Sequence, residues 1–164
     1  MIRVAVVTIS DSVVAGTRVD RSGSELRERV ESLGWAVEAQ PVVADERDQI
    51  AALLASLADS GRFSVVLTTG GTGVALRDVT PEATRDVLER EIPGLPELMR
   101  TEGHKATPFA VLSRAVAGTR GRCLIVNLPG SPKGAVESFN AISQLLPHIV
   151  DLMEGRTGHT DVPH

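Results

Sequence analysis

The chain has 164 residues, of which 42% are hydrophobic, and a formal net charge of −4 at pH 7. This size predicts a single globular domain that buries a core of its own. The acidic balance, two lysines and 2% aromatic residues argue against a nucleic-acid-binding protein, which needs clustered basic residues or stacking platforms.

The first seventy residues alternate between strand and helix patterns. They predict a β-branched strand at 4–9, a polar loop at 10–23, a helix at 24–34, a strand at 35–43 with an edge or bend at Pro41, a helix at 45–61 and a strand at 63–70. This alternation is typical of an α/β domain. We therefore expect a three-layer fold with a largely parallel central sheet and helices on both faces.

The remaining residues are less regular. They predict a helix with Thr80 as its cap and Pro81 in its first turn, broken at 93–96, and short helices at 98–104 and 109–116. A glycine turn and a core strand follow within 118–134, then an amphipathic segment at 135–153 that Pro147 interrupts. One domain at 1–154 and a disordered tail at 155–164 are expected.

Cysteine content and the N-terminal sequence bear on the compartment. Cys123 is the only cysteine and lies in an apolar run, so it is expected to be structural. The N-terminal apolar stretch is shorter than a membrane-spanning helix and lacks a small-residue cleavage site. A cytoplasmic protein without a membrane partner is expected.

The stretch "TTGGTG" at 68–73 directly follows a predicted strand. Glycines let a backbone approach a ligand, and successive amides and threonine hydroxyls offer donors to phosphate oxygens. Neither a Walker A loop nor a dinucleotide fingerprint matches, since the required lysine and third glycine are missing. An anion site is favoured over the alternative, which is a plain turn.

Two aspartates stand near predicted helix starts. Asp78 and Asp45 could each cap a helix or hold Mg²⁺, a cation that takes one or two carboxylates together with substrate oxygens. Arg77 could neutralise phosphate charge or be a solvated surface residue. The later stretch "NLPGSPKG" at 127–134 offers a second small-residue loop with Lys133 as a point charge, or simply a turn before a helix.

No nucleophile or zinc site emerges from the sequence. The histidines are scattered, and no serine, histidine and acid grouping can be assigned from spacing. The pattern favours chemistry in which two substrates react with each other while the protein positions them and screens their charge.

These motifs, in this order, resemble the molybdopterin adenylyltransferase family, which includes bacterial Mog and MoaB proteins and the related domains of plant Cnx1 and animal gephyrin. The matching residues are "TTGGTG", "RDVTPEAT", "TP", "LSR" and "NLPGSPKG". The resemblance implies a trimer that binds molybdopterin and transfers AMP from Mg-ATP to its terminal phosphate. Other molybdenum cofactor assembly proteins are expected as further partners.

Residue by residue, the resemblance implies catalytic and metal-holding roles for Asp45 and Asp78. The expected substrate and nucleotide contacts are Ser10, Asp11, Ser12, Thr69, Gly70, Gly71, Thr72, Gly73, Arg77, Ser113, Arg114, Pro129, Gly130, Ser131, Pro132 and Lys133. Ala44 and Leu76 stand where many relatives carry proline. Two alternatives remain: a pterin-binding carrier or scaffold of the MoaB type, and a nucleotide pyrophosphatase of the competence-damage type, whose usual loop fits less well.

Overall fold

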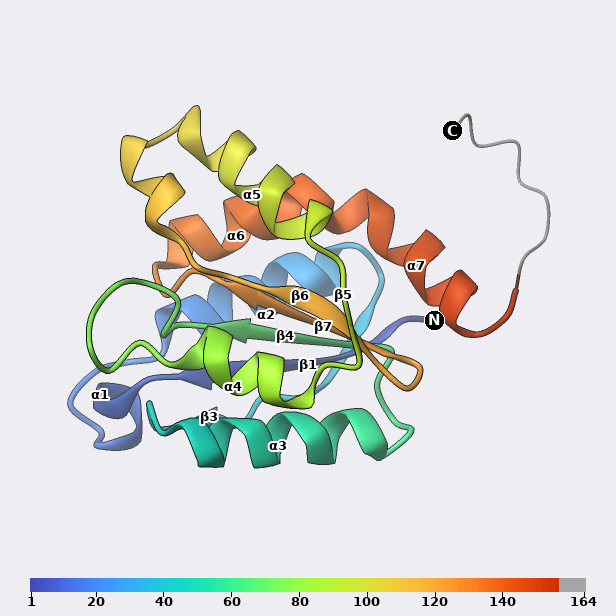
Figure 1. Cartoon of the computed structure of the whole chain (residues 1–164), viewed down its shortest axis with the longest axis horizontal. Coiled ribbons are helices and arrows are strands. Elements are labelled where there is room, and N and C mark those ends of the chain that lie inside the picture. The colour runs from blue at the N-terminus through green and yellow to red at the C-terminus, as the bar shows by residue number, and fades with distance from the viewer. Residues whose placement is uncertain (157–164) are drawn as a thin grey trace.

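A central sheet of seven strands organises the chain, whose residues 1–156 are described by a computed structural model (Figure 1). The strands are β1 (Arg3–Ile9), β2 (Ala36–Ala39), β3 (Val42–Val43), β4 (Val65–Thr69), β5 (Arg90–Glu91), β6 (Ala117–Arg120) and β7 (Cys123–Leu128). Their order is β2-β1-β4-β7-β6-β5, and β3 also pairs with β1. All pairs are parallel except β5 with β6 and β6 with β7.

Helices cover both faces of this sheet. They are α1 (Asp11–Val14), α2 (Arg21–Ser32), α3 (Arg47–Asp59), α4 (Thr80–Val87), α5 (Gly94–His104), α6 (Pro132–Ile142) and α7 (Leu146–Met153), with 3-10 turns η1 (Pro108–Leu112) and η2 (Ser143–Leu145). Helices α2, α5, α6 and α7 pack on one face, and α3 and α4 on the other (Figure 1). The predicted three-layer α/β fold is confirmed.

The two hydrophobic cores follow from the alternation of side chains along each strand. In β1, Val4 and Val6 belong to the core under α2 and α6, whereas Ala5 and Val7 belong to the core under α3. Both faces are therefore apolar, which explains the nearly continuous hydrophobic run of this strand. Cys123 is buried in β7, and burial raises its pKa to about 12, as expected for a structural thiol.

Several predicted elements agree with the structure. Pro41 separates β2 from β3, so the expected bend at the sheet edge is confirmed. Pro147 lies in the first turn of α7, and the 3-10 turn η2 just ahead of it divides the predicted amphipathic segment into α6 and α7. No helix among residues 1–156 is long and apolar enough to cross a membrane.

Other predictions were wrong in detail. The polar loop at 10–23 contains the single turn α1, and α2 begins inside it because Asp20 caps the helix by accepting from the Gly23 amide at 2.9 Å. Helix α5 begins at Gly94, ahead of the predicted start at 98, since a proline in a first turn needs no amide partner. The predicted helix at 109–116 is only the 3-10 turn η1.

Thr80 is the first residue of α4 and not its cap. Val79 occupies the cap position, while the Thr80 hydroxyl donates to the Gly70 carbonyl at 2.9 Å. The Thr80 amide also donates to the Gly71 carbonyl at 3.1 Å. These two bonds close the loop 70–80 back onto the end of β4. Of the predicted tail at 155–164, the residues from 157 onward lie outside the described part of the chain. Arg156, which is described, pairs with Asp151.

The carboxyl ends of β1, β4 and β7 are level with one another. Thr69 of β4 pairs in register with Thr8 of β1 and with Leu128 of β7. The chain then turns at Gly70, whose φ is 107° and where a Cβ atom would lie 2.2 Å from the Ile9 carbonyl oxygen. Only glycine allows this approach, so the loops of three strands meet at one point.

We expect Gly70→Ala to lower the free energy of unfolding by about 3 kcal/mol or more, because the backbone strain and the clash with Ile9 act together. Gly121→Ala is the matched control: its φ is 57°, but nothing lies within 4 Å of the added Cβ. That variant should lose about 1 kcal/mol. Urea unfolding of both variants measures the difference, and equal losses would show that the close approach at Gly70 is unimportant.

Candidate functional site

Two cavities open side by side at the carboxyl end of the sheet. The apolar cavity, of about 490 Å³, is lined by the glycine loop, α5, η1 and the start of α6, with Met99, Phe109 and Leu112 among its apolar walls. The polar cavity, of about 500 Å³, is lined by the ends of β1 and β4 and by the segment 18–22, including Arg18 and Asp45. Each cavity is large enough to take a small organic substrate.

Four residues line both cavities: Gly71, Asp78, Gly130 and Ser131. We call them the shared wall. The loops after β4 and β7 supply it, and they touch there, since a Cβ atom on Gly130 would lie 3.2 Å from the Gly70 Cα. The Thr69 hydroxyl donates to the Pro129 carbonyl at 2.7 Å and fastens the two loops together. Groups from ligands in the two cavities can therefore meet at this wall.

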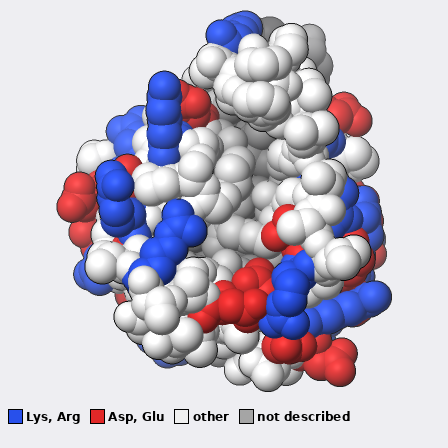
Figure 2. Space-filling view, turned by 90° about the vertical axis from the view of Figure 1, so that its left-hand side faces the viewer, with Lys and Arg blue, Asp and Glu red and all other residues white. Residues whose placement is uncertain are grey.

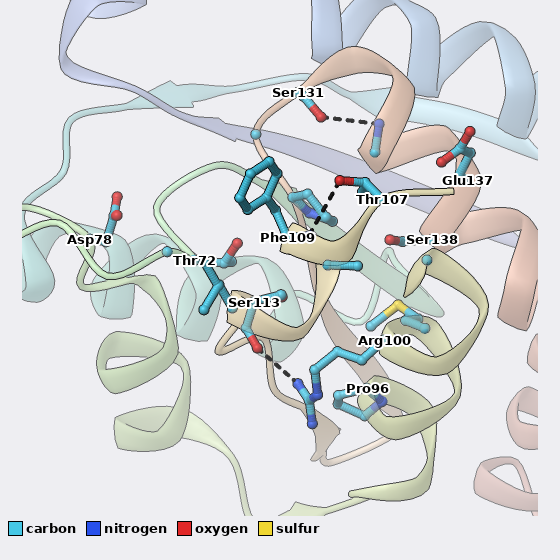
Figure 3. A pocket seen from close by; sticks show the side chains of 18 of the residues that line it. Thr72, Asp78, Pro96, Arg100, Thr107, Phe109, Ser113, Ser131, Glu137 and Ser138 are labelled. Atoms are coloured by element: carbon cyan, nitrogen blue, oxygen red, sulfur yellow. Dashed lines mark hydrogen bonds between the residues drawn. The ribbon is translucent and has the colours of Figure 1, made fainter. Parts of the chain in front are cut away.

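The start of α6 places the N-terminus of a helix at the shared wall. Ser131 caps this helix by accepting from the Gly134 amide at 3.1 Å, as Figure 3 shows at the edge of the apolar cavity. Pro132 lines the polar cavity and Gly134 the apolar one. A helix N-terminus favours anions because its amides and its dipole both present positive charge. The shared wall is consequently suited to phosphate groups.

Asp45 and Asp11 hold each other through their main chains. The Asp11 amide donates to Asp45 Oδ2 at 2.9 Å, and the Asp45 amide donates to Asp11 Oδ1 at 3.0 Å. This reciprocal pair joins the turn after β1 to the turn after β3. Asp45 Oδ1 accepts no hydrogen bond from the described residues and lies 3.1 Å from the position of a Cβ atom on Gly71.

The charge states of these carboxyls are set by different neighbours. Partial burial raises the pKa of Asp45, the Asp11 amide opposes that rise, and the charges of Asp11 and Asp78 add to it. The pKa of Asp11 is lowered, chiefly by its hydrogen bonds from Arg77. Several negative charges close together repel one another, and a bound cation would relieve this repulsion.

Asp45 and Asp78 fit a magnesium site that ligands would complete. Both line the polar cavity, and Asp78 uses one oxygen, Oδ2, to accept the Ala75 amide at 2.9 Å. No group of three or more His, Cys, Asp or Glu residues within 1–156 could hold a metal by itself. Two carboxylates that leave places for water and phosphate oxygens match the preference of Mg²⁺.

Arg77 is paired with protein carboxylates. Its guanidinium donates to both oxygens of Asp11, at 2.8 and 3.0 Å, and to Glu46 Oε1 at 3.1 Å. Figure 2 shows the surroundings: carboxylates gather at the lower margin of a hollow, and Lys and Arg side chains stand on both sides of it. The phosphate-neutralising role expected for Arg77 stays a prediction.

Arg114 holds the glycine loop through hydrogen bonds to its main-chain oxygens. Its side chain donates to the carbonyls of Gly73 and Asp78, each at 2.7 Å, and to the carboxylate of Glu82. Its amide donates to the Thr72 carbonyl at 2.8 Å. Three of its four contacts are to main-chain oxygens at the two ends of the loop, so Arg114 fixes the loop that carries Asp78.

Most of the site residues expected from the sequence come together at the two cavities. Those that line at least one cavity are Ser10, Asp45, Thr69, Gly70, Gly71, Thr72, Gly73, Asp78, Ser113, Pro129, Gly130, Ser131 and Pro132. Asp11, Ser12, Arg77, Arg114 and Lys133 lie behind or beside these walls. Ser12 lies 3.1 Å from the Ser10 hydroxyl, and Lys133 pairs with Glu137 at 3.8 Å.

Sequence reasoning missed one side of each cavity. In the polar cavity the missed residues come from the segment 18–22, including Arg18. In the apolar cavity they come from α5, from η1 and its cap Thr107, and from α6, and Figure 3 shows Pro96, Arg100, Thr107, Phe109 and Glu137 among them. No signal in the sequence distinguishes Phe109 from the buried Phe63 and Phe139; the structure alone shows that Phe109 is 73% exposed.

Known proteins resemble this chain along most of its length. A family model described as a probable molybdopterin binding domain matches residues 5–148. A molybdopterin adenylyltransferase of Helicobacter pylori is 44% identical over 156 residues, which cover 94% of this chain and 89% of the relative. The molybdopterin adenylyltransferase of Escherichia coli is 37% identical, with coverage of 94% and 86%.

Solved structures agree with the sequence relatives. The molybdopterin biosynthesis enzyme MoaB of Thermus thermophilus matches with a TM-score of 0.89 and 50% identity, covering 94% of this chain and 98% of its own. A MogA structure matches with a TM-score of 0.87 and 35% identity, covering 92% and 99%.

We expect Arg114→Gln to lower the free energy of unfolding by about 1–3 kcal/mol, because charged hydrogen bonds to partly buried groups are lost. Arg114 lowers the pKa of Glu82, so its stabilisation is present at neutral pH and is lost as the pH falls below the usual carboxyl value near 4.5. The difference between variant and wild type in urea unfolding should therefore shrink at pH 3.

Arg85→Gln serves as the control, since Arg85 makes one exposed bond to Glu91 at 3.1 Å and should cost less than about 1 kcal/mol. Hydrogen exchange should show faster exchange of the amides of 75–80 in Arg114→Gln only. Unchanged exchange there would show that Arg114 does not brace the loop.

Proposed function

Because this chain belongs to the molybdopterin-binding domain family, we propose that it is a molybdopterin adenylyltransferase of molybdenum cofactor biosynthesis. It transfers AMP from Mg-ATP to the terminal phosphate of molybdopterin and releases pyrophosphate. The names of the H. pylori and E. coli relatives, which match over nearly the whole chain, support this activity. The observation that carries the proposal is the shared wall, where two cavities of similar volume meet beside Asp78.

The arrangement suits a reaction between two bound substrates. One substrate occupies each cavity, and their phosphates meet at the shared wall. A phosphate oxygen of the pterin attacks the α-phosphorus of ATP, and the bond from that phosphorus to the bridging oxygen of pyrophosphate breaks. No protein nucleophile is needed, so the contribution of the protein is orientation and charge stabilisation.

Each part of the wall has a task in this scheme. The amides of the glycine loop bind phosphate oxygens, and the positive end of the α6 dipole attracts them. Asp45 and Asp78 hold Mg²⁺, which when bound neutralises charge on the triphosphate and on the departing pyrophosphate. The apolar walls around Phe109 exclude water and bind a planar ring.

We expect Asp78→Asn to lower the rate of product formation at least about 100-fold, because a negative group that holds the metal is lost. The fold should persist, since the asparagine oxygen can still accept the Ala75 amide. Purified protein is incubated with Mg-ATP and fresh molybdopterin, and adenylylated pterin is measured by mass spectrometry.

Wild-type protein should yield the adenylylated pterin, whereas Asp78→Asn should retain pterin without forming it. Pterin bound by both proteins with no adenylate from either would contradict the enzyme and favour a carrier of the MoaB type. Hydrolysis of ADP-ribose by the wild type, without transfer, would identify a nucleotide pyrophosphatase instead.

A pair of variants tests the assignment of one substrate to each cavity. Phe109→Ala removes a wall of the apolar cavity, and Arg18→Ala removes a charge from the polar cavity. We expect each variant to raise KM for one substrate, and the two variants to affect different substrates. Steady-state kinetics with each substrate varied in turn measures this; a rise for the same substrate in both variants would contradict the arrangement.

The assembly proposed from the family resemblance is a homotrimer. Large exposed apolar side chains outside both cavities, at Leu76 and Val111, support contacts between copies, because such groups gain free energy when they are covered. Light scattering on purified protein should give three times the monomer mass. A cytoplasmic location and contacts with other cofactor assembly proteins remain predictions.

A further inference from the structure

Arg77 lies outside both cavity walls, although it precedes Asp78 in the chain. Its guanidinium holds Asp11 with two hydrogen bonds and Glu46 with a third. The three residues come from the loop 70–80, from α1 and from the turn before α3. Arg77 therefore ties together three segments that are far apart in the sequence.

Asp11, which Arg77 holds, is in turn hydrogen-bonded to Asp45. The same Oδ1 atom of Asp11 accepts from Arg77 and from the Asp45 amide, each at 3.0 Å. In return, the Asp11 amide holds Asp45 Oδ2 at 2.9 Å. One carboxylate oxygen of Asp45 is thus fixed by the main chain of Asp11, whose own side chain is fixed by Arg77.

The remaining oxygen of Asp45 faces the glycine loop. Asp45 lines the polar cavity, and its Oδ1 atom lies beside Gly71, one of the shared-wall residues. The two oxygens of the Asp45 carboxylate rotate together, so Oδ1 cannot turn away without loss of the bond from the Asp11 amide to Oδ2. The orientation of this oxygen is therefore coupled to the Arg77–Asp11 contact.

We propose that Arg77 is a positioning residue, which acts through Asp11 to hold Asp45 in the orientation needed for a divalent cation. This inference rests on the proposed function for its catalytic consequence, whereas its effect on metal binding stands by itself. Because Arg77 is adjacent to Asp78, the same contact also restrains the second carboxylate. Arg77, Asp11 and Asp45 are called the clip.

The chemistry of arginine suits this task better than that of lysine. A planar guanidinium can bond both oxygens of one carboxylate and keep a further N–H for another, as Arg77 does with Asp11 and Glu46. A lysine ammonium is a point charge on a flexible stem and imposes no such orientation. Arg77→Lys should consequently retain charge while losing most of the positioning.

The clip contributes little to the stability of the fold. The side chains of Arg77 and Asp11 are 57% and 45% exposed, and exposed ion pairs contribute about 0–1 kcal/mol. Variants of the clip should therefore fold. Arg47 and Asp86 provide a matched control, since they form a similar two-bond pair, at 2.8 Å for each bond and with 52% and 39% exposure, on α3 and α4 outside both cavities.

The test compares Arg77→Gln, Arg77→Lys, Asp11→Asn, the Arg77→Gln/Asp11→Asn double variant and Arg47→Gln. Electron paramagnetic resonance measures the affinity for Mn²⁺ in the presence of a non-hydrolysable ATP analogue. Steady-state kinetics separates kcat from KM for ATP. Loss of a group that orients a metal ligand typically lowers metal affinity or activity about 10–100-fold.

We expect Arg77→Gln, Arg77→Lys and Asp11→Asn each to weaken Mn²⁺ binding and lower kcat by about 10-fold or more, with little change in KM for ATP. The double variant should be no worse than either single variant, because both substitutions break the same clip. Arg47→Gln should behave as wild type.

Two results would overturn the inference. If Arg77→Gln raises KM for ATP while kcat and Mn²⁺ affinity stay unchanged, Arg77 binds phosphate and does not position Asp45. If the effects of Arg77→Gln and Asp11→Asn are additive, the two residues act separately. Should wild-type protein form no adenylated pterin, the proposed function fails, and the Mn²⁺ affinities alone still decide whether the clip exists.

Discussion

Parallel pairing of β1, β4 and β7 ends three strands at one level of the sheet, and Gly70 lets their loops converge there. A Cβ atom at that position would meet the Ile9 carbonyl, and one at Gly130 would press on Gly70 itself. The two cavities and their shared wall exist because these backbones approach so closely. The side chains around them, including Asp45 and Asp78, are placed by this backbone geometry.

Hydrogen bonds from arginines and from main-chain amides offset the negative charge of the carboxylates at the site. Asp11 lies beside Asp45, and each carboxylate accepts a hydrogen bond from a fixed donor. Arg77 donates to Asp11, and the Asp11 amide donates to Asp45. The Arg114 guanidinium donates to the Glu82 carboxylate and to two carbonyls of the glycine loop. Because these arginines are paired within the protein, we propose that the remaining carboxylate oxygens bind a cation and that loop amides bind phosphates.

Much of this site could be predicted from the sequence because it lies in loops with recognisable composition. The alternating pattern gave the fold class, and the motifs gave the family, both of which are confirmed. The partners of Arg77 and Arg114 could not be predicted, since a sequence shows a charge but not which carboxylate or carbonyl it reaches. The α5 and η1 wall was missed for another reason: packing of Phe109 and Met99 around a cavity leaves no local motif.

We propose that two substrates react across the shared wall of Gly71, Asp78, Gly130 and Ser131. A crystal structure of the protein with adenylylated molybdopterin bound tests it most directly. We expect the diphosphate bridge to lie against this wall, with the pterin in one cavity and the adenosine in the other. A product whose two halves share one cavity, or whose diphosphate lies away from Asp78, would contradict it.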